Sequence, residues 1–121
     1  MLGHKDFVAA LVEEFPELKE AVEGDPELLH VQMGEFAALT QRAINANDFP
    51  LLRRCFALAD RFYADPDPQL ENAFNVSFLE DLDFRGSPKA NKLMSSRLHR
   101  GWVEINEYLD QLLTRKPNWR P

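Results

Sequence analysis

The segment 72–84, NAFNVSFLEDLDF, decides the fold of this chain because its apolar residues fit two different periods. Phe74, Val76 and Phe78 alternate with polar residues as in a half-buried strand, yet positions 74 and 78 also share one face of a helix. A strand needs a partner, and no other segment offers a comparable alternating run. The sequence therefore favours a helix here.

A helix over about 68–82 would carry apolar side chains almost all round its axis. These side chains belong to Ala73, Phe74, Val76, Phe78, Leu79 and Leu82. A helix that is apolar on every side has to be enclosed by other elements, so we expect it to be the central one. The asparagines and the serine within it would then need hydrogen-bond partners, because a buried amide without one is costly.

Prolines and capping residues divide the rest of the chain into further helices. Asp25 with Pro26, Pro50, Asp67 with Pro68, and Ser87 with Pro88 are typical helix starts, and Ser87 is expected to act as an N-cap. Apolar stripes with helical spacing follow each start. The sequence predicts an all-α, single-domain bundle of about six or seven mostly antiparallel helices. We assign residues 1–116 to this domain and 117–121 to a C-terminal tail, with docking of Trp119 on the domain as an alternative.

The composition is that of a soluble globular protein, with 45% hydrophobic and 28% charged residues. No run is long and apolar enough to span a bilayer, and the first residues lack a signal-peptide pattern, so we expect a cytoplasmic protein. A single cysteine, Cys55, leaves no internal disulfide. The net charge of −6 is uneven, since residues 85–121 hold eight bases against three acids. We expect these bases mainly to pair with acids of the same chain.

The sequence offers little chemistry for catalysis. His4, His30 and His99 have no metal-binding spacing, and Cys55 lies on an apolar stripe with no neighbouring base. No glycine-rich loop is present to hold phosphate. We therefore predict a protein that is not an enzyme, with no catalytic residue, metal or cofactor. A small hydrolase is the least favoured alternative, and it would need a closed pocket joining a carboxylate to His30 or His99.

The most promising surface is acidic. Six residues form the predicted partner-binding cluster: Asp60, Asp65, Glu71, Glu80, Asp81 and Asp83. Exposed acids on a rigid scaffold suit a basic protein partner, because complementary charge speeds encounter and excludes wrong partners. The last three acids also follow the central helix, where the helix dipole disfavours them, so an offsetting base is expected.

A nucleic-acid-associated regulator is the main alternative. It would use the basic C-terminal third, where arginine and lysine side chains occur near two tryptophans. The residues concerned are Arg97, Arg100, Arg115, Lys116 and Arg120, with Trp102 and Trp119. Trp102 also belongs to the apolar stripe of the last helix, so we expect it in the core and regard nucleic acid as the less favoured partner.

The segment LENAFNVSFLEDLDF at 70–84 follows a helical hairpin, ALTQRAINANDFPLLRRCFALADRFYAD, at 38–65. Together these segments resemble the central signature of a small bacterial all-helical family of unknown function. Such proteins are similar to the immunity proteins of polymorphic toxin systems. The resemblance implies an all-helical fold and a protein partner, for which a basic toxin is the most specific candidate, and it supplies no catalytic residues. It covers about residues 30–84, and the basic C-terminal helix has no counterpart in it.

Overall fold

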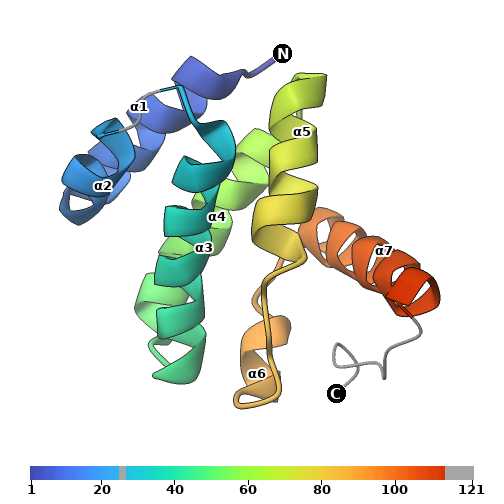
Figure 1. Ribbon diagram of the computed structural model, residues 1–121. Coiled ribbons are helices and arrows are strands. Elements are labelled where there is room, and N and C mark those ends of the chain that lie inside the picture. The colour runs from blue at the N-terminus through green and yellow to red at the C-terminus, as the bar shows by residue number, and fades with distance from the viewer. Residues whose placement is uncertain (25–26, 114–121) are drawn as a thin grey trace.

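A computed structural model describes residues 1–24 and 27–113 of the chain (Figure 1). Within these ranges the chain is an all-α, single-domain bundle. Its elements are α1 (His4–Glu14), the 3-10 turn η1 (Pro16–Leu18), α2 (Lys19–Glu23), α3 (Leu29–Asn45), α4 (Phe49–Tyr63), α5 (Pro68–Phe74), the π turn η2 (Asn75–Leu79), α6 (Pro88–Asn91) and α7 (Ser96–Leu113). The only extended pairing in the described part is an isolated bridge between Leu2 and Pro66.

Helices α3 and α4 form the hairpin on which the bundle is built. The turn between them places Asn47 at a positive φ of 53°, a conformation that asparagine tolerates better than most residues. Asp48 then accepts a hydrogen bond from the backbone N–H of Leu51 at 3.2 Å, and Pro50 occupies the first turn of α4. This short connection sets α3 and α4 side by side and antiparallel.

The segment 72–84 begins as a helix, as predicted. Asp67 caps α5 by accepting from the N–H of Leu70 at 2.8 Å, and α5 runs directly into η2. The helix lies between α3 and α7 (Figure 1). The Phe78 ring stacks on Phe36 with centroids 4.9 Å apart, and the Phe74 ring meets Phe7 edge-on at 5.4 Å. The core of the molecule is therefore an aromatic cluster centred on this helix.

The prediction of a helix that is enclosed on every side is wrong. Val76 is 38% exposed, and helical structure ends at Leu79 rather than near residue 82. From Asn75 the backbone widens into a π turn, in which the N–H of Glu80 donates to the carbonyl of Asn75 at 3.1 Å. The helix thus has a buried side and an outer side, and the outer side carries polar residues.

Helix α7 is positioned by its aromatic stripe. Trp102 is fully buried, where its ring meets Phe84 edge-on at 5.2 Å and its indole N–H donates to the Leu82 carbonyl at 3.4 Å. Leu98 and Leu109 are buried on the same side, as the spacing predicted, whereas Leu112 is 60% exposed.

Ser87 precedes α6, as predicted, but it does not cap the helix. Its hydroxyl instead donates to the Asn47 side-chain oxygen in the α3–α4 turn, so its role is to join two loops.

Two of the sequence predictions lie outside the described residues. These are the helix start at Asp25 and Pro26, and the C-terminal tail with Trp119. Helix α3 itself begins at Leu29, after Leu28. Across residues 1–24 and 27–113, none of the helices combines the length and the apolar character that crossing a membrane requires.

Candidate functional site

Among the six predicted acids, Asp60, Asp65 and Asp83 form ion pairs that the structure describes. Asp60 accepts from the Ser95 hydroxyl at 2.6 Å and from Arg97 at 3.3 Å. Asp65 lies 3.5 Å from the amino group of Met1. Such pairs partly cancel the charge that a partner would meet.

Asp83 is the third paired acid, and its partner is the offsetting base expected after the central helix. The Arg85 guanidinium donates to Asp83 at 2.7 Å, and these hydrogen bonds hold the pKa of Asp83 below its ordinary value. The Asp83 backbone is bound in turn by the Gln41 side chain near the end of α3. Asp83 therefore lies toward the α3–α4 turn, whereas Asp65 follows the opposite end of α4, so the six acids are spread along the bundle.

The other three acids lie on the central helix and just after it. Glu80 is half-buried at the end of η2. Asp81 is exposed as a residue, yet nearby groups displace part of the water around its carboxylate, and this desolvation raises the pKa of Asp81. Glu71 is exposed on α5 and makes no ion pair with any residue that the structure describes.

A polar centre connects α4, η2 and α7 on the outer side of the central helix. The Tyr63 hydroxyl donates to the Asn75 side-chain oxygen at 2.8 Å. Gly101 permits this arrangement, because a Cβ atom there would lie only 2.5 Å from the Tyr63 hydroxyl oxygen. A hollow of about 170 Å³ opens beside these residues, and Glu104 and Tyr108 line it as well.

Negative charge dominates around this polar centre. Burial raises the pKa of Tyr63, and the carboxylates of Glu71 and Glu104 raise it further. Neither carboxylate pairs with a cation in the described part of the chain. Tyr108, which is 58% exposed, and Val76 add apolar area nearby. We call the surface formed by Glu71, Val76, Glu104 and Tyr108 the α5–α7 face.

A second polar contact ties the outer side of η2 to α3. His30 Nδ1 lies 2.7 Å from the Ser77 hydroxyl oxygen, on the exposed side of the helix. His4 bonds to the Gln32 side chain, which also donates to the Val22 carbonyl at 2.9 Å. The three histidines are thus dispersed, and in residues 1–24 and 27–113 no three metal-binding side chains converge.

Cys55 is fully buried, as its place on the apolar stripe of α4 predicted. Desolvation raises the pKa of the thiol to about 11. The sulfur is therefore protonated near neutral pH, whereas a nucleophilic cysteine needs its thiolate form.

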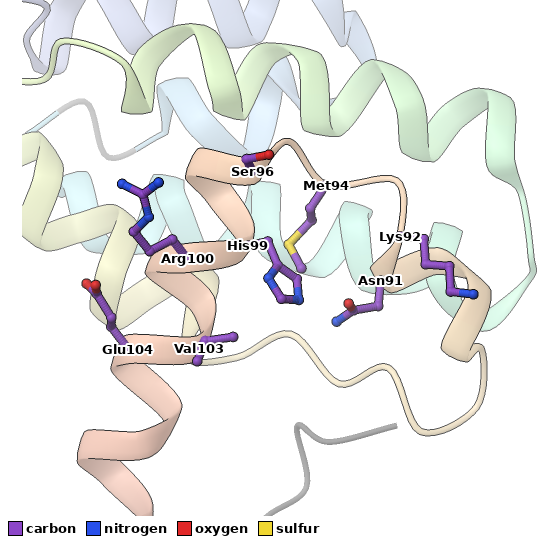
Figure 2. A pocket seen from close by; sticks show the side chains of 8 residues that line it. All are labelled: Asn91, Lys92, Met94, Ser96, His99, Arg100, Val103 and Glu104. Atoms are coloured by element: carbon purple, nitrogen blue, oxygen red, sulfur yellow. The ribbon is translucent and has the colours of Figure 1, made fainter.

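A hollow lies between α6 and α7, and Figure 2 shows the side chains around it. Its volume is about 730 Å³, and we call it the α6–α7 hollow. It is lined by Asn91, Lys92, Met94, Ser96, His99, Arg100, Val103 and Glu104. His99 and Glu104 both line this open hollow, and no hydrogen bond between them is described.

The basic C-terminal third is partly compensated within the described residues. Arg85 pairs with Asp83 and Arg97 pairs with Asp60, whereas Lys92 and Arg100 line the α6–α7 hollow without an ion pair. Lys89 also has no described ion pair, so two of the three uncompensated bases in the described part of this region line the hollow.

The sequence analysis did not identify Tyr63, Asn75, Glu104 or Tyr108. The one signal for them was Gly101, a glycine in the middle of a strongly amphipathic helix. Glycine weakens a helix interior, so its presence there indicates that another group approaches closely. The crossing of α4 and α7 decides which group approaches Gly101, and this crossing cannot be derived from local sequence patterns.

The described residues thus define a small all-α protein with two surface features, the α5–α7 face and the α6–α7 hollow. A family model described as a domain of unknown function, DUF7674, matches residues 8–110, and the chain belongs to this family. The matched range includes every residue of both surface features. Neither a curated protein nor a solved structure matches the chain. Family membership therefore assigns no activity.

Proposed function

We propose that this protein is a non-catalytic protein-binding module that captures a basic partner on its α5–α7 face. The observation that supports the proposal is the pair of uncompensated carboxylates, Glu71 and Glu104, around the partly buried Tyr63 hydroxyl. In its most specific form, the module is of the immunity type and covers a basic toxin surface. The resemblance of the central segments to such proteins motivates this form.

The chemistry of the face suits a cationic partner. Carboxylates without internal partners leave a negative field that accelerates encounter with a basic surface. Tyr108 offers a large, rigid contact with a polar end, and tyrosine is enriched among the residues that dominate binding energy at interfaces. Glu71 is the one predicted acid on this face. Asp60, Asp65 and Asp83 contribute less, because each already has an internal cation.

The test is capture of the partner from the native cell with three forms of the protein. The first is the unchanged chain, and the second carries Glu71→Lys with Glu104→Lys. The third carries Glu13→Lys with Glu20→Lys, which changes the net charge equally at exposed positions of α1 and α2. We expect a basic protein that is captured by the first and third forms, is lost from the second, and is released by salt.

Two results would contradict the proposal. One is equal loss of capture with both double variants, because the protein would then respond only to net charge. The other is capture of a partner that is not basic. A further variant, reversing Glu80, Asp81 and Asp83 together, separates the predicted cluster from the α5–α7 face. Loss of binding in this variant alone would assign the interface to the segment that contains Glu80, Asp81 and Asp83 instead of the α5–α7 face.

A further inference from the structure

The α6–α7 hollow has features of a binding site that the proposed function does not use. Its volume of about 730 Å³ falls within the range of about 300–1,000 Å³ that is usual for small-molecule sites. Its walls combine apolar groups, from Met94 and Val103, with several polar groups. Such a mixture holds a ligand by apolar contact and orients it by a few hydrogen bonds.

Asn91 is the observation that points to a ligand. It is the last residue of α6 and is only 9% exposed, yet its side-chain amide makes no hydrogen bond with a described residue. Figure 2 shows this amide pointing into the hollow toward the His99 ring, and the Met94 side chain reaches the same ring from the other side of the hollow's wall. No buried side-chain polar atom in the described residues lacks a partner, so this amide reaches the surface of the hollow, where its N–H groups and its oxygen are available to a bound molecule.

The packing of α7 holds His99 in place. Its ring lies against Trp102 with centroids 5.8 Å apart, and Trp102 is itself fixed in the core by Phe84. His99 also lies in the first turn of α7, where its backbone N–H donates to the carbonyl of Ser95. The imidazole therefore faces the hollow from a rigid support, which is what orienting a ligand requires.

The charges around the hollow favour an anion. Lys92 and Arg100 flank the hollow at opposite ends in Figure 2, with their charged groups directed outward, and neither makes an ion pair with a described residue. Glu104 is the one carboxylate in the lining, so the cations outnumber it. The Asn91 amide and the Ser96 hydroxyl can each donate a hydrogen bond to an oxyanion, as can an imidazole N–H.

We propose that the α6–α7 hollow binds a small organic oxyanion, a carboxylate or a phosphate monoester carried on a short apolar body. The oxyanion accepts hydrogen bonds from Asn91 and His99 and is attracted by Lys92 and Arg100. The apolar body contacts Met94 and Val103. This hollow is a different surface from the α5–α7 face, although Glu104 belongs to both.

Three probes with the same aromatic body test the proposal: phenyl phosphate, benzoate and benzylamine. Each is titrated into the full chain while NMR follows the Asn91 side-chain amide and the His99 ring. We expect saturable shifts of both groups with at least one of the two anions and none with benzylamine. The stronger of the two anions identifies the kind of oxyanion. Equal shifts with benzylamine, or no saturation with either anion, would overturn the proposal.

Matched variants locate the site. Lys92→Ser and Lys89→Ser remove the same charge from α6 or its end, but only Lys92 lines the hollow. We expect Lys92→Ser to weaken anion binding about tenfold, the effect of losing one charge-assisted contact, and Lys89→Ser to leave it nearly unchanged. Asn91→Leu and His99→Phe, each checked for an unchanged thermal midpoint, should weaken binding similarly. An equal loss of anion affinity in Lys89→Ser and Lys92→Ser would show that the effect depends only on the net charge of the protein, and it would overturn the proposal.

A competition experiment separates a small ligand from a nucleic acid. A single-stranded oligonucleotide is added to the complex with the better anion. If the oligonucleotide displaces the anion at much lower concentration, the hollow is a phosphate-backbone contact and the small-ligand proposal is wrong. If the anion remains bound, the proposal stands.

Discussion

The inner and outer sides of the central helix differ more than any other two regions of the molecule. Phe74 and Phe78 on the inner side are fully buried among other rings. On the outer side, Asn75 and Ser77 bind side chains from α4 and α3, and Val76 is partly exposed. One short segment thus supplies both the centre of the core and the framework of a surface. The difference shows that the hydrophobic residues of this segment have two roles: Phe74 and Phe78 fill the core, whereas Val76 lies at the surface.

The π turn is where these two roles meet. It places one extra residue in the turn and leaves the bond from Glu80 to Asn75 in place of a regular α-helical bond. Single π turns within helices occur frequently at functional sites. Here the turn carries both Asn75 and Ser77, the two residues that connect the central helix to its neighbours on the outer side.

The largest expected effect contrasts the two sides directly. Phe78→Ala should lower the free energy of unfolding by about 3–5 kcal/mol, because it leaves a cavity beside the stacked Phe36 ring. Val76→Ala, two residues earlier on the outer side, should change it by less than about 0.5 kcal/mol. Urea denaturation of both variants measures the contrast. Similar losses for the two would show that the outer side is also core.

Gly101→Ala should have the second-largest effect. It should lower the free energy of unfolding by about 1–3 kcal/mol, because the added Cβ atom overpacks against Tyr63. Helix propensity alone predicts the opposite sign, a gain of about 1 kcal/mol. Gly34→Ala in α3 is the control, because a Cβ there meets nothing within 4 Å, and it should stabilise the protein. The Gly101→Ala loss should shrink when Tyr63→Leu is combined with it. A stabilising Gly101→Ala would disprove the close approach.

Tyr63→Phe should lower the free energy of unfolding by about 0.5–1.5 kcal/mol, because it removes the hydrogen bond to Asn75. Tyr108→Phe, at an exposed position, should have almost no effect on stability. The Tyr63→Phe difference should also depend on pH. Since the pKa of Tyr63 is raised in the folded state, its stabilisation is complete below the ordinary tyrosine pKa and is lost as pH rises through the folded-state value. The difference should therefore narrow in alkali.

Asp81→Asn should give the smallest effect, a slight gain in stability at neutral pH. The carboxylate is partly desolvated and follows a helix end where negative charge is unfavourable. Its raised pKa means that protonation relieves the same penalty, so the gain should disappear as pH falls through the folded-state pKa of Asp81. Thermal unfolding of the two proteins across acidic pH measures this. A gain that persists in acid would assign the effect to another cause.

Much of the fold could be predicted from local signals. Asp67 followed by Pro68 predicted the start of α5, and the cap is present at the N–H of Leu70. The lack of a second alternating segment favoured a helix over a strand at Phe74, Val76 and Phe78, and the structure confirms a helix there. These signals are informative because a helix cap depends only on neighbouring residues, and because a strand needs a second strand whose presence can be checked along the sequence.

The polar centre could not be predicted, because its residues are joined only by the packing of α4, η2 and α7. Nothing near Tyr63 in the sequence indicates Asn75 as its partner, since their contact depends on the crossing angle of separate helices. The π turn was missed for a related reason. Tertiary contacts stabilise the extra residue, whereas the spacing of Phe74 and Phe78 is that of an ordinary α-helix.

The backbone N–H of Leu2 donates to the Asp65 carbonyl at 2.8 Å, and the Leu2 carbonyl accepts from the Asp67 N–H at 2.7 Å. These two hydrogen bonds close a loop of more than sixty residues. The entropy lost in closing a loop grows with its length, whereas the α3–α4 turn closes over only a few residues. The hairpin is therefore expected to assemble early, and the junction of α1 with α5 late. Hydrogen exchange at these two amides would then report the first opening of the native molecule, well before its aromatic centre is exposed to solvent.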